Sequence, residues 1–419
     1  MKTVFLHFVL LTCVFHLLLC ESHAQWVQSG LSNVDISALV ASGTDLIAGT
    51  NHCYDGSCNG TGVFRSTDDG TTWIDASSGL TNTDVRSFVV SGTNLFAGTY
   101  GGGVFRSTDS GASWSNVDSG LTKPYVYALT ISPDTLATLF AATYGGVFRS
   151  TNNGTSWTKV NTGLTDTIVL SLVVSDTNLF AGTCCDGVFR STNNGTIWSR
   201  ADSGLENTEV WCFAVSDTNL FAGTYGDGIF LSTNNGTNWT AVNFGLTLPD
   251  KDIRSFAVWQ KNIFAGTDGG VFLSTSNGGS WSHVDSGLIG THVTSFGVNG
   301  ANLFAGMVSN GVWRRPLSEV TTSVKTYDSD LPMHFSLGQN YPNPFNPSTV
   351  ISYELPKASH VTLKVYNVLG REVAVLVNEH KPAGVHHLRF NAIDLPSGVY
   401  FCRLQTGKFS EMKKLILLR

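Results

Sequence analysis

Four carboxylates stand where they could do acid and base chemistry: Asp84, Glu209, Asp252 and Asp268. Hydrolysis of a glycoside needs two carboxyl groups about 5 to 9.5 Å apart, on either side of the scissile bond. Nothing in the spacing of the four singles out a pair. The motifs G-x-S-x-G, Walker A, G-x-G-x-x-G and H-E-x-x-H are also absent. Catalysis is therefore an alternative hypothesis rather than the main one.

Aromatic and cationic residues occupy comparable places and make a second kind of chemistry available. They are Arg86, Tyr100, Tyr127, Tyr144, Trp211, Tyr225 and Arg254. Such a mixture suits a carbohydrate or a peptide, because rings offer stacking surfaces and charged groups accept or donate hydrogen bonds. The competing interpretation is that some of these side chains only fill interfaces inside the fold. We take the set as the candidate ligand-binding residues.

The elements that must position these residues follow from a repeat. The stretch VFRSTDDGTTW, residues 63 to 73, returns five times with small changes, and its closing tryptophans lie 41 to 43 residues apart. Each repeat contains four short β-type runs separated by Gly, Asn, Asp or Ser, which is the pattern of a propeller blade. We denote the four runs A to D, from the axis outwards. This pattern predicts an all-β chain.

Counting the runs gives the number of blades. A-to-C sets begin at Ile36, Val85, Val126, Val169, Val210, Ile253 and Val293. Runs of type D begin at Trp26, Trp73, Trp114, Trp157, Trp198, Trp239 and Trp281. The chain therefore opens with a lone D run and closes with a set that lacks one. Residues 25–316 are predicted to form a seven-bladed β-propeller whose last blade is completed by the N-terminal strand, which removes an exposed sheet edge.

The variable residues fall at two places in each repeat. One is the entry to run A, where the chain reads Asp35, Asp84, Tyr125, Ile168, Glu209, Asp252 and His292 before the run. The other is the turn between runs B and C. Both places lie on the same face of a propeller, whereas the repeated turn between C and D lies on the opposite face. The candidate site is therefore expected on the first face.

The repeated turn itself is predicted to be structural. Its third position drifts through Asp68, Asp109, Asn152, Asn193, Asn234 and Ser276. These side chains all accept hydrogen bonds from backbone amides in a turn, but they differ as acids, bases and nucleophiles. A catalytic role would not survive the exchange.

The pattern S-x-D-x-G-x-x-W of these turns resembles the Asp box of BNR-repeat propellers. That class includes sialidases, xyloglucan hydrolases, sortilin-like receptors and photosystem II assembly factors. The resemblance covers roughly residues 25 to 316. The chain departs from the enzymes of the class: sialidases have six blades and an R-I-P motif, and xyloglucan hydrolases use two propellers. If the chain is an enzyme, a glycoside hydrolase is expected.

The N-terminus and the cysteines indicate export. Residues 1–24 have the basic, apolar and small-residue regions of a signal peptide, and no other long apolar run would anchor the mature chain. Cys53 and Cys58 are the best candidate disulfide in an oxidising compartment. For Cys184, Cys185 and Cys212, an adjacent bridge, a link to Cys212 and free thiols all stay open. The prediction includes no metal site and no cofactor.

Charge separates the two parts of the chain. Residues 25 to 319 hold 13 basic and 23 acidic residues, which argues against a nucleic-acid partner. Residues 320 to 419 hold 11 basic and 7 acidic residues, which suggests a module with its own partner. Residues 317–335 are predicted to be a linker. Alternating strands separated by LG, AG, PSG and TG turns predict a small Ig-like β-sandwich over residues 336–419.

The stretches QNYPNPFNPST, LKVYNVLGREVAVLVNEHKPAG and LPSGVYFCRLQTGKFSEMKKLILLR resemble the type A C-terminal sorting domain of type IX secretion cargo. The resemblance implies recognition of residues 336–419 by the type IX secretion machinery of a Gram-negative bacterium. The protein would then be secreted or held at the outer-membrane surface. The main hypothesis is a monomeric, non-catalytic propeller that binds glycan or protein. A glycoside hydrolase and a structural or adhesion component are the alternatives.

Overall fold

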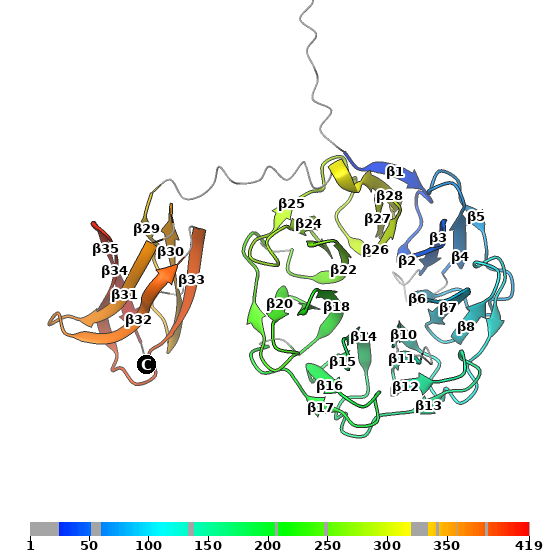
Figure 1. Ribbon diagram of the computed structural model, residues 1–419, viewed down its shortest axis with the longest axis horizontal. Coiled ribbons are helices and arrows are strands. Elements are labelled where there is room, and N and C mark those ends of the chain that lie inside the picture. The colour runs from blue at the N-terminus through cyan, green and yellow to red at the C-terminus, as the bar shows by residue number, and fades with distance from the viewer. Residues whose placement is uncertain are drawn as a thin grey trace, which may run out of the picture. The chain divides into compact units, whose positions relative to one another are not determined.

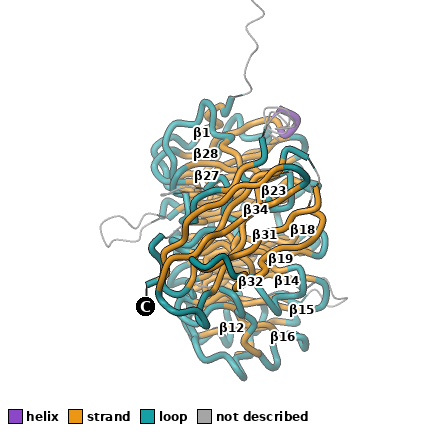
Figure 2. Tube along the Cα trace, turned by 90° about the vertical axis from the view of Figure 1, so that its left-hand side faces the viewer, coloured by secondary structure: helices purple, strands orange, loops and turns teal. Residues whose placement is uncertain are grey.

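The computed structural model describes residues 25–51, 60–132, 138–205, 208–246, 250–319, 334–340, 343–357, 359–381 and 384–418. The predicted signal peptide and the Cys53 and Cys58 pair lie outside these residues. The chain divides into two compact units, Met1–Ser323 and Val324–Arg419. Strands and loops make up nearly all that is described, with one short helical turn at residues 317 to 319 (Figure 2).

Counted over the described residues, the first unit contains seven four-stranded antiparallel sheets, arranged as the blades of a ring (Figure 1). The A strands of blades 1 to 7 are β2 (Ile36–Ser42), β6 (Val85–Ser91), β10 (Val126–Ile131), β14 (Val169–Ser175), β18 (Val210–Ser216), β22 (Ile253–Trp259) and β26 (Val293–Asn299). The B strands are β3 (Asp45–Thr50), β7 (Asn94–Thr99), β11 (Leu139–Thr143), β15 (Asn178–Thr183), β19 (Asn219–Thr224), β23 (Asn262–Thr267) and β27 (Asn302–Met307).

The outer strands complete each blade. The C strands are β4 (Val63–Ser66), β8 (Gly103–Ser107), β12 (Gly146–Ser150), β16 (Val188–Ser191), β20 (Ile229–Ser232), β24 (Gly270–Ser274) and β28 (Gly311–Pro316). The D strands are β5 (Ile74–Asp75), β9 (Ser115–Asn116), β13 (Thr158–Lys159), β17 (Ser199–Arg200), β21 (Thr240–Ala241), β25 (Ser282–His283) and β1 (Val27–Gly30). The seven-bladed fold is confirmed, and all seven A strands begin at the predicted residues.

The ring closes as predicted, through the N-terminal strand. Strand β1 pairs with β28 in the last blade, with Val27 opposite Arg314. The D strands differ from prediction in one respect: each begins one residue after its tryptophan, and six of them are only two residues long. They are short because they are exposed outer strands from which the chain soon leaves for the next blade. In blade 1, the pairing of β4 with β5 is followed by one further hydrogen bond, from the Ala76 N–H to the Val63 carbonyl.

The tryptophans tie neighbouring blades together. The Trp198 indole donates to the Val160 carbonyl of the preceding blade at 2.7 Å, and the Trp198 N–H donates to the Thr162 carbonyl. Trp114, Trp157, Trp239, Trp281 and Trp26 make the same two kinds of contact. All six are at least 95% buried, whereas Trp73, next to the closure, is half-buried. The apolar cores accordingly lie between blades rather than within them.

The repeated turns between C and D strands are held by one hydrogen-bond pattern. The Thr72 N–H donates to Asp68 Oδ1 at 2.8 Å, and the Ser66 hydroxyl donates to the same oxygen. In blade 3 the Ser156 N–H donates to Asn152 Oδ1, and in blade 6 the Ser280 N–H donates to Ser276 Oγ. Asp, Asn and Ser thus present an acceptor to the same backbone amide, which is the property that the turn requires.

This pattern leads to a pH prediction for the double variant Asp68→Asn, Asp109→Asn. Hydrogen bonds from Thr72 lower the pKa of Asp68 to about 2, and bonds from Ser113 lower the pKa of Asp109 to about 2. A carboxyl whose pKa is lower in the folded state stabilises the fold above its unfolded pKa and stops doing so as pH falls through the folded value. At pH 7 the variant lacks this contribution, so its thermal unfolding temperature should lie somewhat below that of the native protein. Between about pH 4 and 2, the variant should lose less stability on acidification. A variant that loses as much as the native chain would contradict this account.

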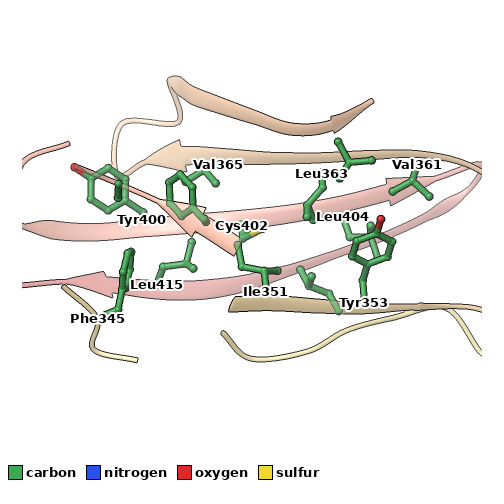
Figure 3. Close-up of a cluster of buried hydrophobic side chains, with 14 of the residues drawn as sticks. Phe345, Ile351, Tyr353, Val361, Leu363, Val365, Tyr400, Cys402, Leu404 and Leu415 are labelled. Atoms are coloured by element: carbon green, nitrogen blue, oxygen red, sulfur yellow. The ribbon is translucent and has the colours of Figure 1, made fainter. Parts of the chain in front are cut away.

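The second unit is a small β-sandwich. One sheet has the order β29 (Ser336–Leu337), β30 (Ser348–Leu355), β33 (Gly384–Asn391). The other has the order β32 (Glu372–Lys381), β31 (Ser359–Asn367), β34 (Gly398–Thr406), β35 (Phe409–Leu417). Alternate apolar residues of both sheets meet in one core, where Ile351 and Tyr353 face Leu363 and Cys402 (Figure 3). The Ig-like sandwich is confirmed.

Candidate functional site

A β-bulge occurs near the start of every A strand and defines the candidate site. In β6, Val85 pairs with Thr99 and Ser87 pairs with Gly98, so that Arg86 between them is the extra residue. The corresponding residues of the seven blades are Ser37, Arg86, Tyr127, Leu170, Trp211, Arg254 and Thr294. A bulge leaves one residue out of the ladder and redirects its side chain. The A strands line the central opening (Figure 1), so we call this end of the opening, with its B–C turns, the mouth.

Blades 2 and 3 contribute a cluster of tyrosines around one arginine. The Tyr100 ring lies 4.9 Å from that of Tyr125 and 5.7 Å from that of Tyr127, measured between centroids. Tyr144 follows at 6.3 Å from Tyr125. The Arg86 guanidinium lies over the Tyr100 ring at 5.1 Å. We call these five residues the tyrosine cluster. Burial and the nearby Tyr100 raise the pKa of Tyr127 to about 12, whereas Tyr125 and Tyr144 expose their rings to solvent.

Blades 5 and 6 contribute a second cluster, centred on Trp211. Its ring stacks on Tyr225 with centroids 4.9 Å apart, and the Arg254 guanidinium lies 4.1 Å from the centre of the indole. The indole N–H donates to Glu209 Oε1 at 2.7 Å. We call Glu209, Trp211, Tyr225 and Arg254 the tryptophan cluster. Tyr225 is 47% exposed, so this cluster also offers an aromatic surface to solvent.

Two of the carboxylates beside these clusters form ion pairs with arginines. Asp84 is 1% exposed and pairs with Arg86, its Oδ1 lying 2.6 Å from Nε. Burial raises the pKa of Asp84, although Arg86 opposes the shift. Asp268 accepts two hydrogen bonds from Arg254, at 2.7 and 2.9 Å, and lies 3.9 Å from His292. Asp252 is half-buried just before β22. The two arginine charges of the mouth are therefore already balanced by carboxylates.

The remaining blades differ in character. The hydroxyl groups of Ser37 in blade 1 and Thr294 in blade 7 donate to backbone carbonyls of their own and the next blade, so these two side chains tie strands together. Blade 4 has Leu170 at the bulge and Cys184 and Cys185 in its B–C turn. Among the described residues, no three His, Cys, Asp or Glu side chains gather where they could hold a metal ion.

The structure thus assembles the predicted ligand-binding residues into two groups. Arg86, Tyr100, Tyr127 and Tyr144 fall in the tyrosine cluster, and Trp211, Tyr225 and Arg254 fall in the tryptophan cluster. Among the four candidate acids, Asp84 stands apart on blade 2, while the others belong to blades 5 and 6. Tyr125 was absent from the predicted binding set although it bridges Tyr100 and Tyr144. Its place in the variable row before strand A was the signal that could have identified it.

The fold and the mouth define a class of protein: a β-propeller with a polar and aromatic mouth, followed in the chain by a β-sandwich. Residues 339–418 match the family described as the secretion system C-terminal sorting domain. The chain therefore carries a sorting domain that indicates export by type IX secretion. Among the described residues, no helix has the length and apolar character that crossing a membrane requires. Comparison with curated proteins finds no match.

Solved structures share the propeller architecture at low sequence identity. PorZ, an essential bacterial surface component of the type IX secretion system of Porphyromonas gingivalis, is 16% identical, with a TM-score of 0.53 over 92% of this chain and 59% of its own. The extracellular domain of the putative hybrid two component system BT3049 from B. thetaiotaomicron is 14% identical, with a TM-score of 0.59 over 94% and 57%. YCF48 bound to D1 peptide is 15% identical, with a TM-score of 0.53 over 70% and 95%. This chain thus spans less than three fifths of the first two proteins.

Proposed function

We propose that this chain is an exported, non-catalytic propeller that binds a glycan at its mouth. The observation that carries the proposal is the pair of clusters, which expose aromatic rings beside charges that are already balanced. A sugar presents apolar C–H faces for stacking and hydroxyl groups for hydrogen bonds, and it brings no net charge that the mouth would have to neutralise. Tyr125, Tyr144 and Tyr225 provide the exposed rings.

A protein or peptide ligand is the second candidate. A propeller of similar fold, YCF48, was solved with D1 peptide bound. Stacked tyrosines and an arginine over a tryptophan would also accept an extended peptide with aromatic side chains. The two ligands make different demands on the arginines of the mouth. A peptide with acidic residues would need an arginine that is not already paired with a carboxylate, whereas a neutral sugar would not.

A glycoside hydrolase is disfavoured by the ion pairs. A general acid or nucleophile must be available to the substrate, whereas Asp84 and Asp268 are held by Arg86 and Arg254. Glu209 and Asp252, on neighbouring blades, remain the acids for this alternative. Hydrolysis of a chromogenic glycan that is lost in Glu209→Gln or Asp252→Asn would support it. A purely structural surface component would bind neither glycan nor protein.

The other parts of the chain fit the same proposal. The repeated turns are Asp boxes with a structural role. Their side chain accepts a hydrogen bond from the same backbone N–H whether it is Asp, Asn or Ser. We assign residues 1–24 to a signal peptide, 25–316 to the propeller, 317–335 to a linker and 336–419 to the sorting domain. Leu317 is nevertheless buried, and its N–H donates to the Ala301 carbonyl of the ring. The machinery of type IX secretion would handle the sorting domain and leave a monomeric propeller secreted or at the cell surface.

A glycan array probed with the full chain tests this function. The double variant Arg86→Ala, Trp211→Ala removes one member of each cluster and is expected to lose at least tenfold in affinity, because stacked aromatic and arginine anchors commonly carry about 2 kcal/mol or more. The control is Arg200→Ala, which removes an exposed arginine paired with Asp202 on an outer strand. Binding that survives in the double variant, or no binding by any of the proteins, would refute a glycan site at the mouth.

A further inference from the structure

We propose that Cys184 and Cys185 close into a disulfide between adjacent residues, and that this bond is a redox-sensitive part of the ligand-binding mouth. The two cysteines form the turn between β15 and β16 of blade 4, on the same face as the tyrosine and tryptophan clusters. Their Sγ atoms lie 3.0 Å apart, and Cys185 is exposed. The second half of the inference rests on the proposed function, whereas the first half does not.

The other described cysteines have positions that disfavour pairing with these two. Cys212 lies in β18 of blade 5, and its thiol donates to the Ile253 carbonyl of blade 6, which directs it away from blade 4. Cys402 is buried in the core of the sandwich, where burial raises the pKa of its thiol to about 12. Each cysteine of the turn therefore has the other as its nearest described partner for oxidation.

The reaction is an exchange with an external disulfide, such as a small-molecule disulfide or a disulfide oxidoreductase. The exposed Cys185 thiolate attacks one sulfur of that disulfide, forming a mixed disulfide and releasing one thiolate. Cys184 then attacks the Cys185 sulfur, and the second external thiolate leaves. Two thiols of the turn are oxidised, one external disulfide is reduced, and the two protons end on the released thiols.

The surroundings of Cys184 set the order of these steps. Its contact with the Cys185 thiol, with burial and the nearby charges of Glu209 and Asp166, raises the pKa of Cys184 to about 12. Cys184 is thus the poorer first nucleophile. Once Cys185 is in the mixed disulfide, that contact is lost and the second step becomes easier. Glu209 also accepts the hydrogen bond from the Trp211 indole, so one carboxylate acts electrostatically on Cys184 and belongs to the tryptophan cluster.

The disulfide is expected to be easily reduced, and its formation is expected to shift the loop of blade 4 at the mouth. Adjacent Cα atoms are about 3.8 Å apart, which is shorter than the usual separation across a disulfide, so the closed ring is strained. Strained, exposed disulfides are the more readily reduced ones. The turn is anchored by the Cys184 N–H on the Ile168 carbonyl and the Cys185 N–H on Asp166 Oδ2. A twist at the peptide between the cysteines would therefore reach the loop that enters blade 4.

Peptide mapping tests the bond itself. The full chain is exported, alkylated without reduction and digested with trypsin. The peptide Val160–Arg190 contains Cys184 and Cys185 and no other cysteine. We expect it unalkylated and lighter by two hydrogen atoms than the reduced peptide, with return to the dithiol in a mild glutathione buffer. Two alkylated thiols after treatment with oxidised glutathione, or a cross-link to the peptide of Cys212, would overturn the inference.

Three variants separate the bond from the proposed function. In the native chain, mild reduction should change glycan affinity severalfold, while Cys184→Ser, Cys185→Ser should bind equally before and after reduction. Cys212→Ser should keep the redox response, which controls for the other thiol of this face.

Glu209→Gln should speed ring closure severalfold, measured by alkylation rather than by binding. A mapped disulfide with no glycan bound would reject the proposed function and leave the bond standing. Equal responses in native and double-serine chains would reject the link to the mouth.

Discussion

Replacing Trp26 by alanine should lower the free energy of unfolding by about 3 to 5 kcal/mol, the usual cost of removing a buried tryptophan side chain. Trp26 is 2% exposed, and it precedes the strand that completes the last blade. Its indole donates to the Val284 carbonyl at 2.7 Å, and its N–H donates to the Ser286 carbonyl at 2.8 Å. Denaturant unfolding followed by tryptophan fluorescence and circular dichroism would measure the loss.

The loss at Trp26 concerns ring closure as well as packing. If β1 detaches, the edge of β28 becomes exposed and invites pairing between molecules. Aggregation at intermediate denaturant concentrations is therefore expected in the variant. Val27→Ala is the matched control, because Val27 is the next residue, begins β1 and is 58% exposed. An effect of Trp26→Ala no larger than that of Val27→Ala would show that the N-terminal strand does not close the ring in solution.

Replacing Gly163 by alanine should destabilise the propeller by about 3 kcal/mol or more, since backbone strain and a steric clash act together. Gly163 has φ of +95°, and a Cβ there would lie 2.1 Å from the carbonyl oxygen of Trp198. The adjacent Thr162 carbonyl accepts the bond from the Trp198 N–H at 2.8 Å. The substitution therefore strains one residue and also pushes apart two neighbouring blades.

Gly92→Ala separates the two contributions. Gly92 has φ of +61° in a turn of blade 2, and a Cβ there would meet nothing within 4 Å. It should cost only about 1 to 2 kcal/mol, which is the price of a left-handed conformation for a residue with a Cβ. Thermal and denaturant unfolding of the two variants would compare them directly. Equal losses would mean that the close approach between Gly163 and Trp198 contributes nothing.

Much of the architecture was determined locally and was therefore predictable. Strand starts such as Val85 and Val126, the turn at Asp68 and the closing strand after Trp26 depend on patterns of a few residues that recur at a fixed spacing. A repeat also makes the deviations visible, because Arg86 and Trp211 stand where the framework does not need them. The number of blades and the face that holds the candidate site followed from counting and from chain direction.

The tertiary structure decided what those deviations do. No local sequence pattern predicts the β-bulge that leaves Arg86 and Trp211 without a partner in the strand pairing. The bulge arises from the pairing of each A strand with the neighbouring B strand. The ion pair of Arg254 with Asp268 and the contact of Tyr100 with Tyr127 likewise join residues that lie 14 and 27 positions apart in the sequence. Sequence alone determined which residues vary at the mouth. Only the closed ring decided which of them meet, because contact depends on neighbouring blades being packed side by side.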